Sequence, residues 1–469
     1  MAMTHIGRCQ RSWSFHATQR TCVERYRGLP CTSHRACRFH RLWLLQIEVP
    51  LQQWDQDVMI ARAAMVFALG LAFTTSNPVL VLGQDATATL NEDGSVATTG
   101  IAQPGQDVQI SEECQAEPSQ VEIVLCTANA FLVTLSDEQR SAVVLPMTEE
   151  NSTAWSNLPC GSNCRVGVQL SDLSGEQVSA ALAVIKAATS DYGDDGYDEL
   201  TQVTMADDIL NASQASGAGG PGSGTPPGEQ PPDGAATPTD AGAAGAPPAG
   251  GGGGYSSTTY FIAFLGEPSA SETWQLQFGG HHLALLKTYR GNVEVGDTPA
   301  FIGVEPKVWT SGDSIYGPLE DDRAAMVAML AGLSEDQLAA AKLDTAFSDV
   351  VLGPGADGQF PSTKVGLRVA ELDDAQRQLV LAAIAEWVRD TAASTADAIM
   401  ADYQAELDET YIAFSGNATL ANHADYVRID GPRVWIEFVC QDGVIYSSQI
   451  HYHTIWRDHE TDYGAIYSF

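Results

Sequence analysis

Four segments of the chain begin with the same helix-start signal, and their spacing constrains the fold more than any other feature. In each, a Ser or Asp can accept a hydrogen bond from a free backbone N–H, and a Gln three residues later can reach back to the cap. The four signals are Leu135-Ser136-x-x-Gln139, Leu173-Ser174-x-x-Gln177, Leu333-Ser334-x-x-Gln337 and Leu372-Asp373-x-x-Gln376. The caps lie 38 residues apart in the first pair and 39 in the second. This spacing predicts four amphipathic helices in two diverged copies of one unit.

The sequences that flank these helices correspond in the same order. Residues 165–168 precede the second cap as the similar residues 364–367 precede the fourth. Farther along the chain, residues 260–266 resemble residues 410–416. The offset between the copies falls from 199 to 150 residues, and most of this change is the length of residues 216–254. Those residues therefore interrupt the first copy and do not separate two domains.

Strand-like sequence follows the helices in each copy. Residues 275–286 alternate polar and apolar side chains, residues 426–440 predict two strands joined at a turn beginning at Asp430, and residues 444–456 predict another strand. Runs of strands beside runs of helices are typical of an antiparallel sheet with helices packed on it. We therefore expect an α+β fold made of two pseudo-symmetric copies of a helix–helix–β-hairpin unit.

Composition separates the expected domain from a flexible insert. Residues 216–254 contain only Gly, Ala, Ser, Thr, Pro, Asp, Glu and Gln, so nothing there can offset the entropy of ordering the chain. We expect this stretch to be a disordered insert and residues 84–112 to be a flexible leader. The remaining residues, 113–215 and 255–469, then form a single α+β domain.

The N-terminal region has the composition of neither the domain nor the insert. Residues 1–58 hold eight Arg, no Lys, four Cys and four His without a sustained period, so we expect them to be unstructured or a wrongly assigned start. The alternatives for the start of translation are Met1 and Met59. Residues 59–83 have the pattern of a secretory signal, with a charged start, an apolar run and small residues before the cleavage point.

A membrane anchor is the rival interpretation of this apolar run. The run begins at Ala63 and is interrupted after Phe73 by five polar or helix-breaking residues, before it reaches the roughly 20 residues that a span needs. We therefore expect cleavage and export, which place the protein outside the cell, in the periplasm or in the cell envelope. Stable membrane insertion is not expected after cleavage.

Charge argues against two kinds of partner, and export bears on the cysteines. The chain has 59 acidic and 24 basic residues, a formal charge of -35 that repels nucleic acid and anionic membrane. Five cysteines would reach an oxidising compartment. They are Cys114, Cys126, Cys160, Cys164 and Cys440. We expect disulfides among them, one of which the turn from Cys160 to Cys164 could close, and a buried free thiol at Cys440, because the spacings match no zinc-finger pattern.

Histidines are placed differently in the two copies. His281 and His282 occur only in the first copy, and the second carries His451-x-His453 in an expected strand. Residues i and i+2 of a strand project to the same face, so the second pair could share a metal ion. One of His281 and His282 could add a ligand, since neighbouring strand residues normally point to opposite faces. Glu437 is a further candidate, because a carboxylate in an apolar strand is costly to bury without a partner.

Other interpretations of the same residues stay open. A His-x-His pair on a strand is often simply exposed or hydrogen-bonded, and Trp456 is as expected in a packed core as beside a substrate. Arg457 and Asp458 could form a structural ion pair. If the histidines bind a metal, Asp458 could instead orient one of them.

The ordered motifs resemble the family called domain of unknown function 3500, over roughly residues 120–467. The motifs that carry the resemblance are Gly266-Glu267-Pro268, Gly280-His281-His282-Leu283 after Trp274, Pro299-x-Phe301-x-Gly303-x-x-Pro306, Tyr426-x-Arg428-Ile429-x-Gly431-Pro432 with Glu437, and His451-x-His453-x-x-Trp456-Arg457-Asp458 with Asp462-x-Gly464. The resemblance implies membership and motif positions but no reaction. The chain departs from the family pattern at residues 438–442, where the family usually has a Tyr-Asp-Asn type stretch.

The residues together predict an exported metal-dependent enzyme, with hydrolysis favoured. His451, His453 and one of His281 or His282 would hold Zn, Cu or Fe. In this hypothesis Glu437 or Asp458 acts as general base and Arg457 stabilises developing negative charge on a small-molecule or peptide substrate. The alternative is a non-catalytic metal- or ligand-binding protein of the cell envelope. An open coordination position would separate the two, since a closed four-ligand site is typical of structure or storage.

Overall fold

The computed structural model describes residues 87–91, 96–99, 108–193, 195–216 and 254–469. The expected unstructured start, the signal segment and residues 217–253 of the insert lie outside this described part. Within it, no helix is both long enough and apolar enough to cross a membrane.

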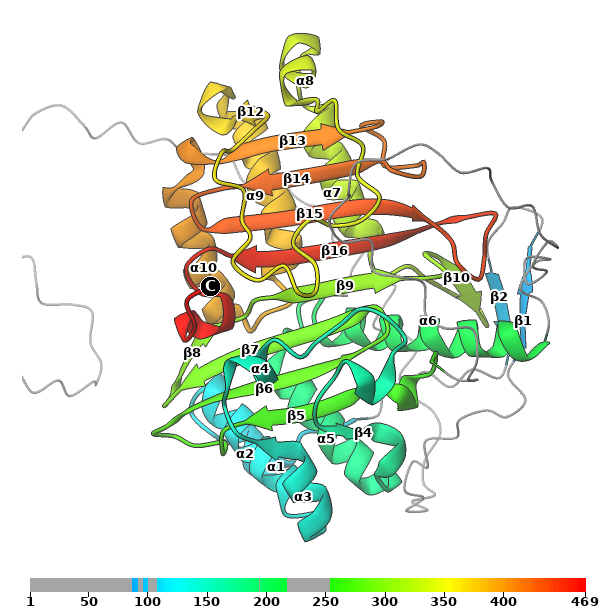
Figure 1. Ribbon diagram of the computed structural model, residues 1–469, viewed down its shortest axis with the longest axis vertical. Coiled ribbons are helices and arrows are strands. Elements are labelled where there is room, and N and C mark those ends of the chain that lie inside the picture. The colour runs from blue at the N-terminus through cyan, green and yellow to red at the C-terminus, as the bar shows by residue number, and fades with distance from the viewer. Residues whose placement is uncertain (1–86, 92–95, 100–107, 194, 217–253) are drawn as a thin grey trace, which may run out of the picture. The chain divides into compact units, whose positions relative to one another are not determined.

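Helices and strands fill most of the described part (Figure 1). The helices are α1 (Glu112–Gln115), α2 (Gln120–Leu132), α3 (Asp137–Val143), α4 (Glu149–Ser152), α5 (Gly175–Ala188), α6 (Tyr197–Ser216), α7 (Glu320–Ala331), α8 (Glu335–Ala341), α9 (Asp374–Val388) and α10 (Ala393–Ala405). The strands of the main sheet are β3 (Val144–Leu145), β4 (Val168–Gln169), β5 (Phe261–Leu265), β6 (Thr273–Gly280), β7 (Leu283–Arg290), β8 (Val293–Gly296), β9 (Ala300–Val304), β12 (Leu367–Arg368), β13 (Tyr411–Ser415), β14 (Tyr426–Asp430), β15 (Val434–Asp442) and β16 (Ile450–Asp458).

The main sheet runs in the order β12-β13-β14-β15-β16-β9-β7-β6-β5-β3, with β4 also paired to β5 and β8 to β7. Its central pair, β16 with β9, is antiparallel and joins the C-terminal strands to those of the middle of the chain. On each side of this pair lies a hairpin, β14–β15 or β6–β7, and then β13 or β5. The α+β class with antiparallel strands is confirmed. The internal duplication stays a prediction.

A second, small sheet includes part of the expected leader. It runs in the order β1-β2-β10-β11. Its strands are β1 (Thr87–Leu90), β2 (Val96–Thr99), β10 (Trp309–Ser311) and β11 (Ser314–Tyr316). Strand β2 pairs in parallel with β10. Backbone pairing therefore joins this part of the leader to residues 309–311.

All four predicted capping boxes form, at the starts of α3, α5, α8 and α9. The capping glutamines also meet in pairs. The Gln177 amide donates to Gln139 Oε1 at 2.9 Å, and the Gln376 amide donates to Gln337 Oε1 at 2.7 Å. Each capping box therefore fixes a helix start and one contact between two helix starts.

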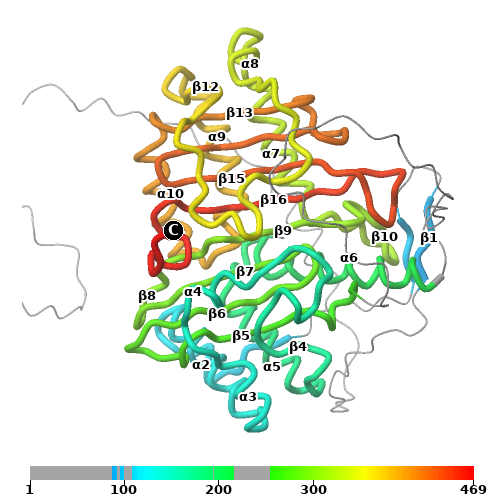
Figure 2. The backbone as a smooth tube through the Cα atoms, viewed as in Figure 1, coloured from blue at the N-terminus to red at the C-terminus, as the bar shows by residue number. Residues whose placement is uncertain are grey.

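The two faces of the main sheet are covered differently. Figure 1 shows α5, α7 and α9 behind one face. On that side Trp456 of β16 donates to the Tyr403 hydroxyl of α10 at 3.1 Å. The opposite face is crossed by two long irregular segments, residues 153–167 and 343–366, which Figure 2 traces in front of the strands. His451 and His453 lie on this second face, because they alternate with the residues that face the helices.

The described residues contain two disulfides, as the cysteine content predicts. Cys114 in α1 is bonded to Cys126 in α2, with a Cα–Cα distance of 5.4 Å. Cys160 is bonded to Cys164 across 6.0 Å between Cα atoms. Cys440 in β15 is a buried free cysteine, also as predicted.

Candidate metal centre

The first histidine pair occupies the tight turn of the β6–β7 hairpin. Gly280 pairs with Leu283, which leaves His281 and His282 as the two turn residues. His282 has a φ of 61°, in the left-handed region. Its backbone N–H donates to the Asn157 carbonyl at 3.1 Å. The sequence had suggested a strand here, with the two side chains on opposite faces, and this was wrong because a turn ends the alternation.

The second pair lies on β16, in the register that the His-x-His pattern predicts. His453 is opposite Gly303 of β9 on one side and Val439 of β15 on the other. Gly303 leaves room for the rings: a Cβ atom there would lie 2.9 Å from His453 Cδ2 and 3.1 Å from His282 Cδ2. A glycine at this position therefore lets a hairpin turn and a central strand bring their imidazoles together.

Three imidazoles meet at this point. One ring nitrogen from each of His282, His451 and His453 lies within 4.8 Å of the others. Nε2 of His451 is 3.2 Å from Nε2 of His453. Two nitrogens bound to one tetrahedral ion at about 2.0–2.1 Å are about 3.3 Å apart, so this spacing fits a shared metal. The three residues are 3%, 1% and 5% exposed, which keeps bulk water from competing for the nitrogens.

Burial favours the neutral form of two of these imidazoles. Desolvation is the largest cause that lowers the pKa of His282 well below its usual range, and the neighbouring histidines lower it further. The pKa of His451 is lowered in the same way. Nδ1 of His282 is buried without a hydrogen-bond partner. A neutral imidazole carries a free lone pair, which is the form that binds a metal.

The third imidazole is oriented by a carboxylate. Nδ1 of His453 lies 2.9 Å from Asp349 Oδ1, and Gln441 Nε2 is 3.0 Å from the same nitrogen. When Nδ1–H donates to Asp349, the lone pair of His453 is on Nε2, the nitrogen that faces His451.

His281 has a different environment from its neighbour. Its Nδ1 lies 2.7 Å from Oδ1 of Asp207, a fully buried residue of α6 that also accepts from the Tyr260 hydroxyl at 3.0 Å. Its ring packs on the His282 ring, with centroids 3.6 Å apart and planes inclined by 31°. Asp207, His281 and His282 also have potential ligand atoms within 4.8 Å. A metal on this second group would have to replace the hydrogen bond between His281 and Asp207, however, so His282 fits the three-histidine group better.

Glu437 lies on the same face of the sheet as the histidines but is bonded elsewhere. Its carboxylate accepts from the backbone N–H of Val351 at 2.7 Å and of Leu352 at 2.9 Å. It also accepts from the Tyr426 hydroxyl at 2.6 Å and the Trp435 indole at 2.8 Å. Burial raises the pKa of Glu437, and these four hydrogen bonds oppose that rise.

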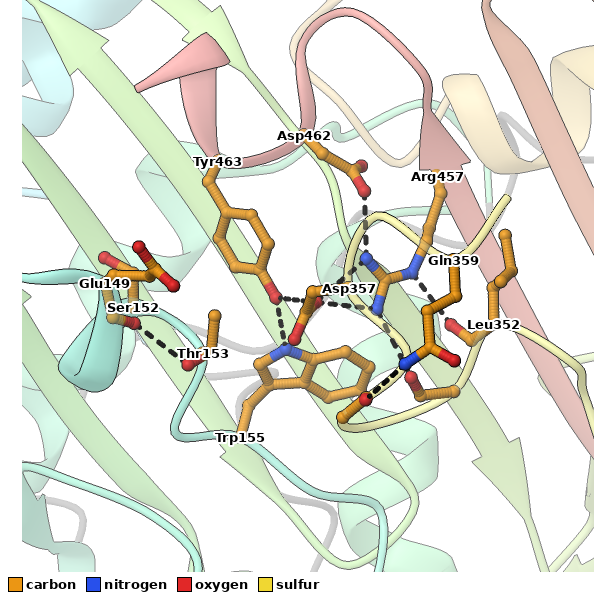
Figure 3. Close-up of polar contacts among 12 residues, drawn as sticks. Glu149, Ser152, Thr153, Trp155, Leu352, Asp357, Gln359, Arg457, Asp462 and Tyr463 are labelled. Carbon is orange, nitrogen blue, oxygen red and sulfur yellow. Dashed lines mark hydrogen bonds and ion pairs between the residues drawn. The ribbon is translucent and has the colours of Figure 1, made fainter. Parts of the chain in front are cut away.

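Arg457 is fully buried and binds the same irregular segment (Figure 3). Its guanidinium donates to the Leu352 carbonyl at 2.8 Å and to Asp357 Oδ1 at 3.0 Å. A second ion pair, at 2.9 Å, joins it to Asp462. Tyr463 donates to the same Asp357 oxygen at 2.6 Å.

Asp458 projects from β16 toward the helices. It accepts from the Tyr403 hydroxyl at 2.9 Å and pairs with Arg433 at 3.1 Å. Its other oxygen accepts from the backbone N–H groups of residues 460 and 461. Asp458 is therefore on the face of the sheet opposite His451 and His453. Catalytic roles for Glu437, Arg457 and Asp458 stay predictions.

Sequence reasoning missed the two carboxylates that contact the histidines. Asp207 lies in α6 and Asp349 in an irregular segment, 74 and 104 residues from their histidine partners. No local pattern links residues so far apart. Gly303 did belong to a recognised motif, but its role as the small residue between two rings depends on strand pairing.

Comparison with known proteins gives a family and no reaction. The model of the family described as "Protein of unknown function (DUF3500)" matches residues 117–465. No curated protein and no solved structure matched the chain. The match covers most of the chain and includes both histidine pairs, as the ordered motifs predicted. The chain therefore belongs to the DUF3500 family.

Proposed function

We propose that this protein is an exported metal-dependent enzyme whose ion is held by His282, His451 and His453. The convergence of three buried imidazoles is the observation that carries the proposal. Burial lowers the pKa of His282 and His451 and so favours their neutral form, and a carboxylate lies beside the third, which is the usual support of a metal-binding histidine. Imidazole ligands suit Zn, Cu or Fe better than Mg or Ca.

Three protein ligands favour catalysis over a structural role. Catalytic zinc sites keep three protein ligands and leave one position for water or substrate, whereas structural sites have four. A bound ion there would supply Lewis acidity for the hydrolysis of a small-molecule or peptide substrate. The hydrogen bonds of Glu437 and Arg457 favour a role in positioning over proton transfer, and Asp458 lies on the wrong face to reach the ion.

Export is part of the proposal. The two disulfides are of the kind that persists in an oxidising compartment, and they support the secretory interpretation of residues 59–83. A periplasmic or cell-envelope location would satisfy the same requirement.

A non-catalytic metal-binding protein is the second candidate. The depth of the three histidines favours it, since each is at most 5% exposed and a substrate needs a path to the ion. The number of exchangeable positions on the ion separates the candidates. Bound Co²⁺ or Mn²⁺ that relaxes solvent protons would favour the enzyme, and a coordinatively closed ion would favour storage or structure.

Elemental analysis of the purified full-length protein tests the site itself. We expect close to one transition-metal ion per chain in the wild type and almost none in the double variant His451→Ala/His453→Ala. His423→Ala is the matched control, because this histidine is half-exposed and its ion pair is with Asp442, not with any of the three clustered histidines. Full metal content in the double variant, with its far-ultraviolet circular dichroism unchanged, would show that these histidines do not bind the ion.

A further inference from the structure

We propose that residues 349–357 act as a strap that sets the orientation of His453, with Asp349 as the positioning residue and with Glu437 and Arg457 as the two anchors of the strap. This inference rests on the proposed metal site. It assigns to Glu437 and Arg457 a control of metal affinity without contact with the ion.

The first residue of the strap, Asp349, contacts His453 directly. Asp349 Oδ1 is 2.9 Å from His453 Nδ1, while the His453 ring itself is only 5% exposed. Asp349 also accepts from the backbone N–H of Val350 at 2.8 Å, which limits the rotation of its side chain. A carboxylate in this place selects the tautomer and the ring angle that direct Nε2 of His453 toward His451.

The first anchor follows within two residues. Glu437 accepts the backbone N–H groups of Val351 and Leu352, at 2.7 and 2.9 Å, one on each carboxylate oxygen. Glu437 is 0% exposed, and Tyr426 and Trp435 fix its two oxygens from the sheet side. Four donors converge on this carboxyl group, so the backbone beside Asp349 is held in a fixed position over the sheet.

The second anchor holds the next part of the strap. Arg457 donates to the carbonyls of Leu352 and Gly353, at 2.8 and 3.3 Å, and to Asp357 (Figure 3). Glu437 thus binds N–H groups and Arg457 binds carbonyl groups of one short stretch of backbone. Glu437 and His453 are also neighbours on the sheet, since Glu437 is opposite Ile455 and His453 is opposite Val439. The anchors and the ligand therefore belong to the same rigid pair of strands.

Metal affinity of Asp349 variants tests the inference in the full-length protein. With Zn²⁺ or Co²⁺ as the probe and a chromophoric chelator as competitor, Asp349→Ala should lower affinity about 10- to 100-fold. Asp349→Asn should lower metal affinity less than Asp349→Ala does, because the amide oxygen of Asn can still accept a hydrogen bond from Nδ1–H of His453. The visible spectrum of bound Co²⁺ should change in the Ala variant, since it reports ligand geometry. Asp344→Asn is the control, an exposed residue of the same segment.

A double-mutant cycle tests the anchors. If Glu437 acts through Asp349, Glu437→Gln should weaken Co²⁺ binding in the wild type and have little further effect in Asp349→Ala. Urea unfolding of each variant shows whether the fold is retained. Asp349 is half-exposed, so we expect its variants to fold. They therefore still test the inference if Glu437→Gln unfolds the protein.

The outcomes separate this inference from the proposed metal site. If the wild type binds neither Zn²⁺ nor Co²⁺ and is purified without Cu or Fe, the metal site itself is refuted. If the wild type binds and Asp349→Ala binds with unchanged affinity and spectrum, the strap has no role in positioning. Additive effects of the Asp349 and Glu437 changes would likewise overturn the proposed route through Asp349.

Discussion

Two adjacent histidines in one turn have different partners, and this difference can be measured. His282 faces His451 and His453, whereas His281 is bonded to Asp207. We expect His282→Ala to lower affinity for Zn²⁺ at least 100-fold, because one of three ligands is lost. His281→Ala should keep the metal stoichiometry. Competition with a chelator gives both affinities, and equal losses in the two variants would mean that both histidines are ligands.

Part of the site follows from residue spacing alone. The His451-x-His453 spacing correctly places both side chains on one face, because a strand alternates with period two. The expected approach of His282 depends on more: a two-residue turn, the small Gly303 and the pairing of β9 with β16. The last two are tertiary facts, and no pattern within ten residues of His282 carries them.

Glu294 predicts how stability depends on pH. It is buried in β8 beside Lys287, and Lys287 also binds Asp297. Burial, with the nearby Asp297 adding, raises the pKa of Glu294 to about 8. The folded state therefore keeps a proton that the unfolded state, with a pKa of about 4.3, has lost. Between these values the folded state binds more protons, so the free energy of unfolding decreases as pH rises through 8.

We expect the free energy of unfolding to fall by about 1 kcal/mol between pH 7 and pH 9 on account of this group. Burial also raises the pKa values of Glu199 and Asp322, which act in the same direction. Urea unfolding at both pH values measures the fall. Glu294→Gln, which resembles the protonated acid, should have a smaller fall than the wild type. An equal fall in the variant would assign the pH dependence to other groups.

At the level of elements, two glycines hold matching places before α5 and α9. Gly167 has a φ of 99° and Gly366 a φ of 106°. A Cβ atom would overlap the carbonyl oxygen of Ile262 at the first position and of Ile412 at the second. We expect Gly167→Ala and Gly366→Ala each to destabilise the fold by about 2–4 kcal/mol in urea unfolding, since strain and overlap combine.

Gly175 provides the control for this pair. It begins α5, and a Cβ atom there would meet no atom within 4 Å. Gly175→Ala should be neutral or slightly stabilising, by about 0.5–1 kcal/mol. Similar losses at Gly167 and Gly366 would support the proposed duplication. A large loss at only one of them would mean that the two segments are held differently.

Element starts were more predictable than the segments between them. A capping box is local chemistry, and all four formed where the sequence places them. Residues 343–366 contain no periodic pattern, and their path depends on contacts with Glu437 and Arg457. The strand pattern over residues 426–440 also holds, as β14 and β15 show. Irregular segments take their shape from distant partners, which a single sequence does not reveal.

For the whole molecule, the central strand pair predicts one cooperative unit. Strands β16 and β9 pair over five residues, from Tyr452 with Val304 to Trp456 with Ala300. The Thr454 hydroxyl also donates to the Ile302 carbonyl across this pair, at 2.9 Å. We expect tryptophan fluorescence and far-ultraviolet circular dichroism to give the same urea midpoint, because neither part of the sheet can open without breaking this pair. Two separate midpoints would contradict this.

The α+β class was predictable from the whole sequence, whereas the strand order was not. Alternating patterns identify strands such as β14, but the meeting of β16 with β9 joins residues about 150 positions apart. Which strands become neighbours depends on how the helices pack against the sheet. The packing energy is spread over the whole core, so no single segment reveals it. The export signal and the insert were assigned by composition, and they lie outside the described residues.

If the proposed site holds an ion, the central strand pair determines when that ion can bind. His282 comes from the β6–β7 turn and His453 from β16, so the three nitrogens are separate until β9 and β16 have paired. A slip of one residue in that pairing would turn His451 and His453 to the helix side. An unfolded chain therefore does not bring the three nitrogens of the proposed site together at one point. At the proposed site, metal binding would follow this pairing, so a chain loaded there is one in which β9 and β16 have already paired in the correct register.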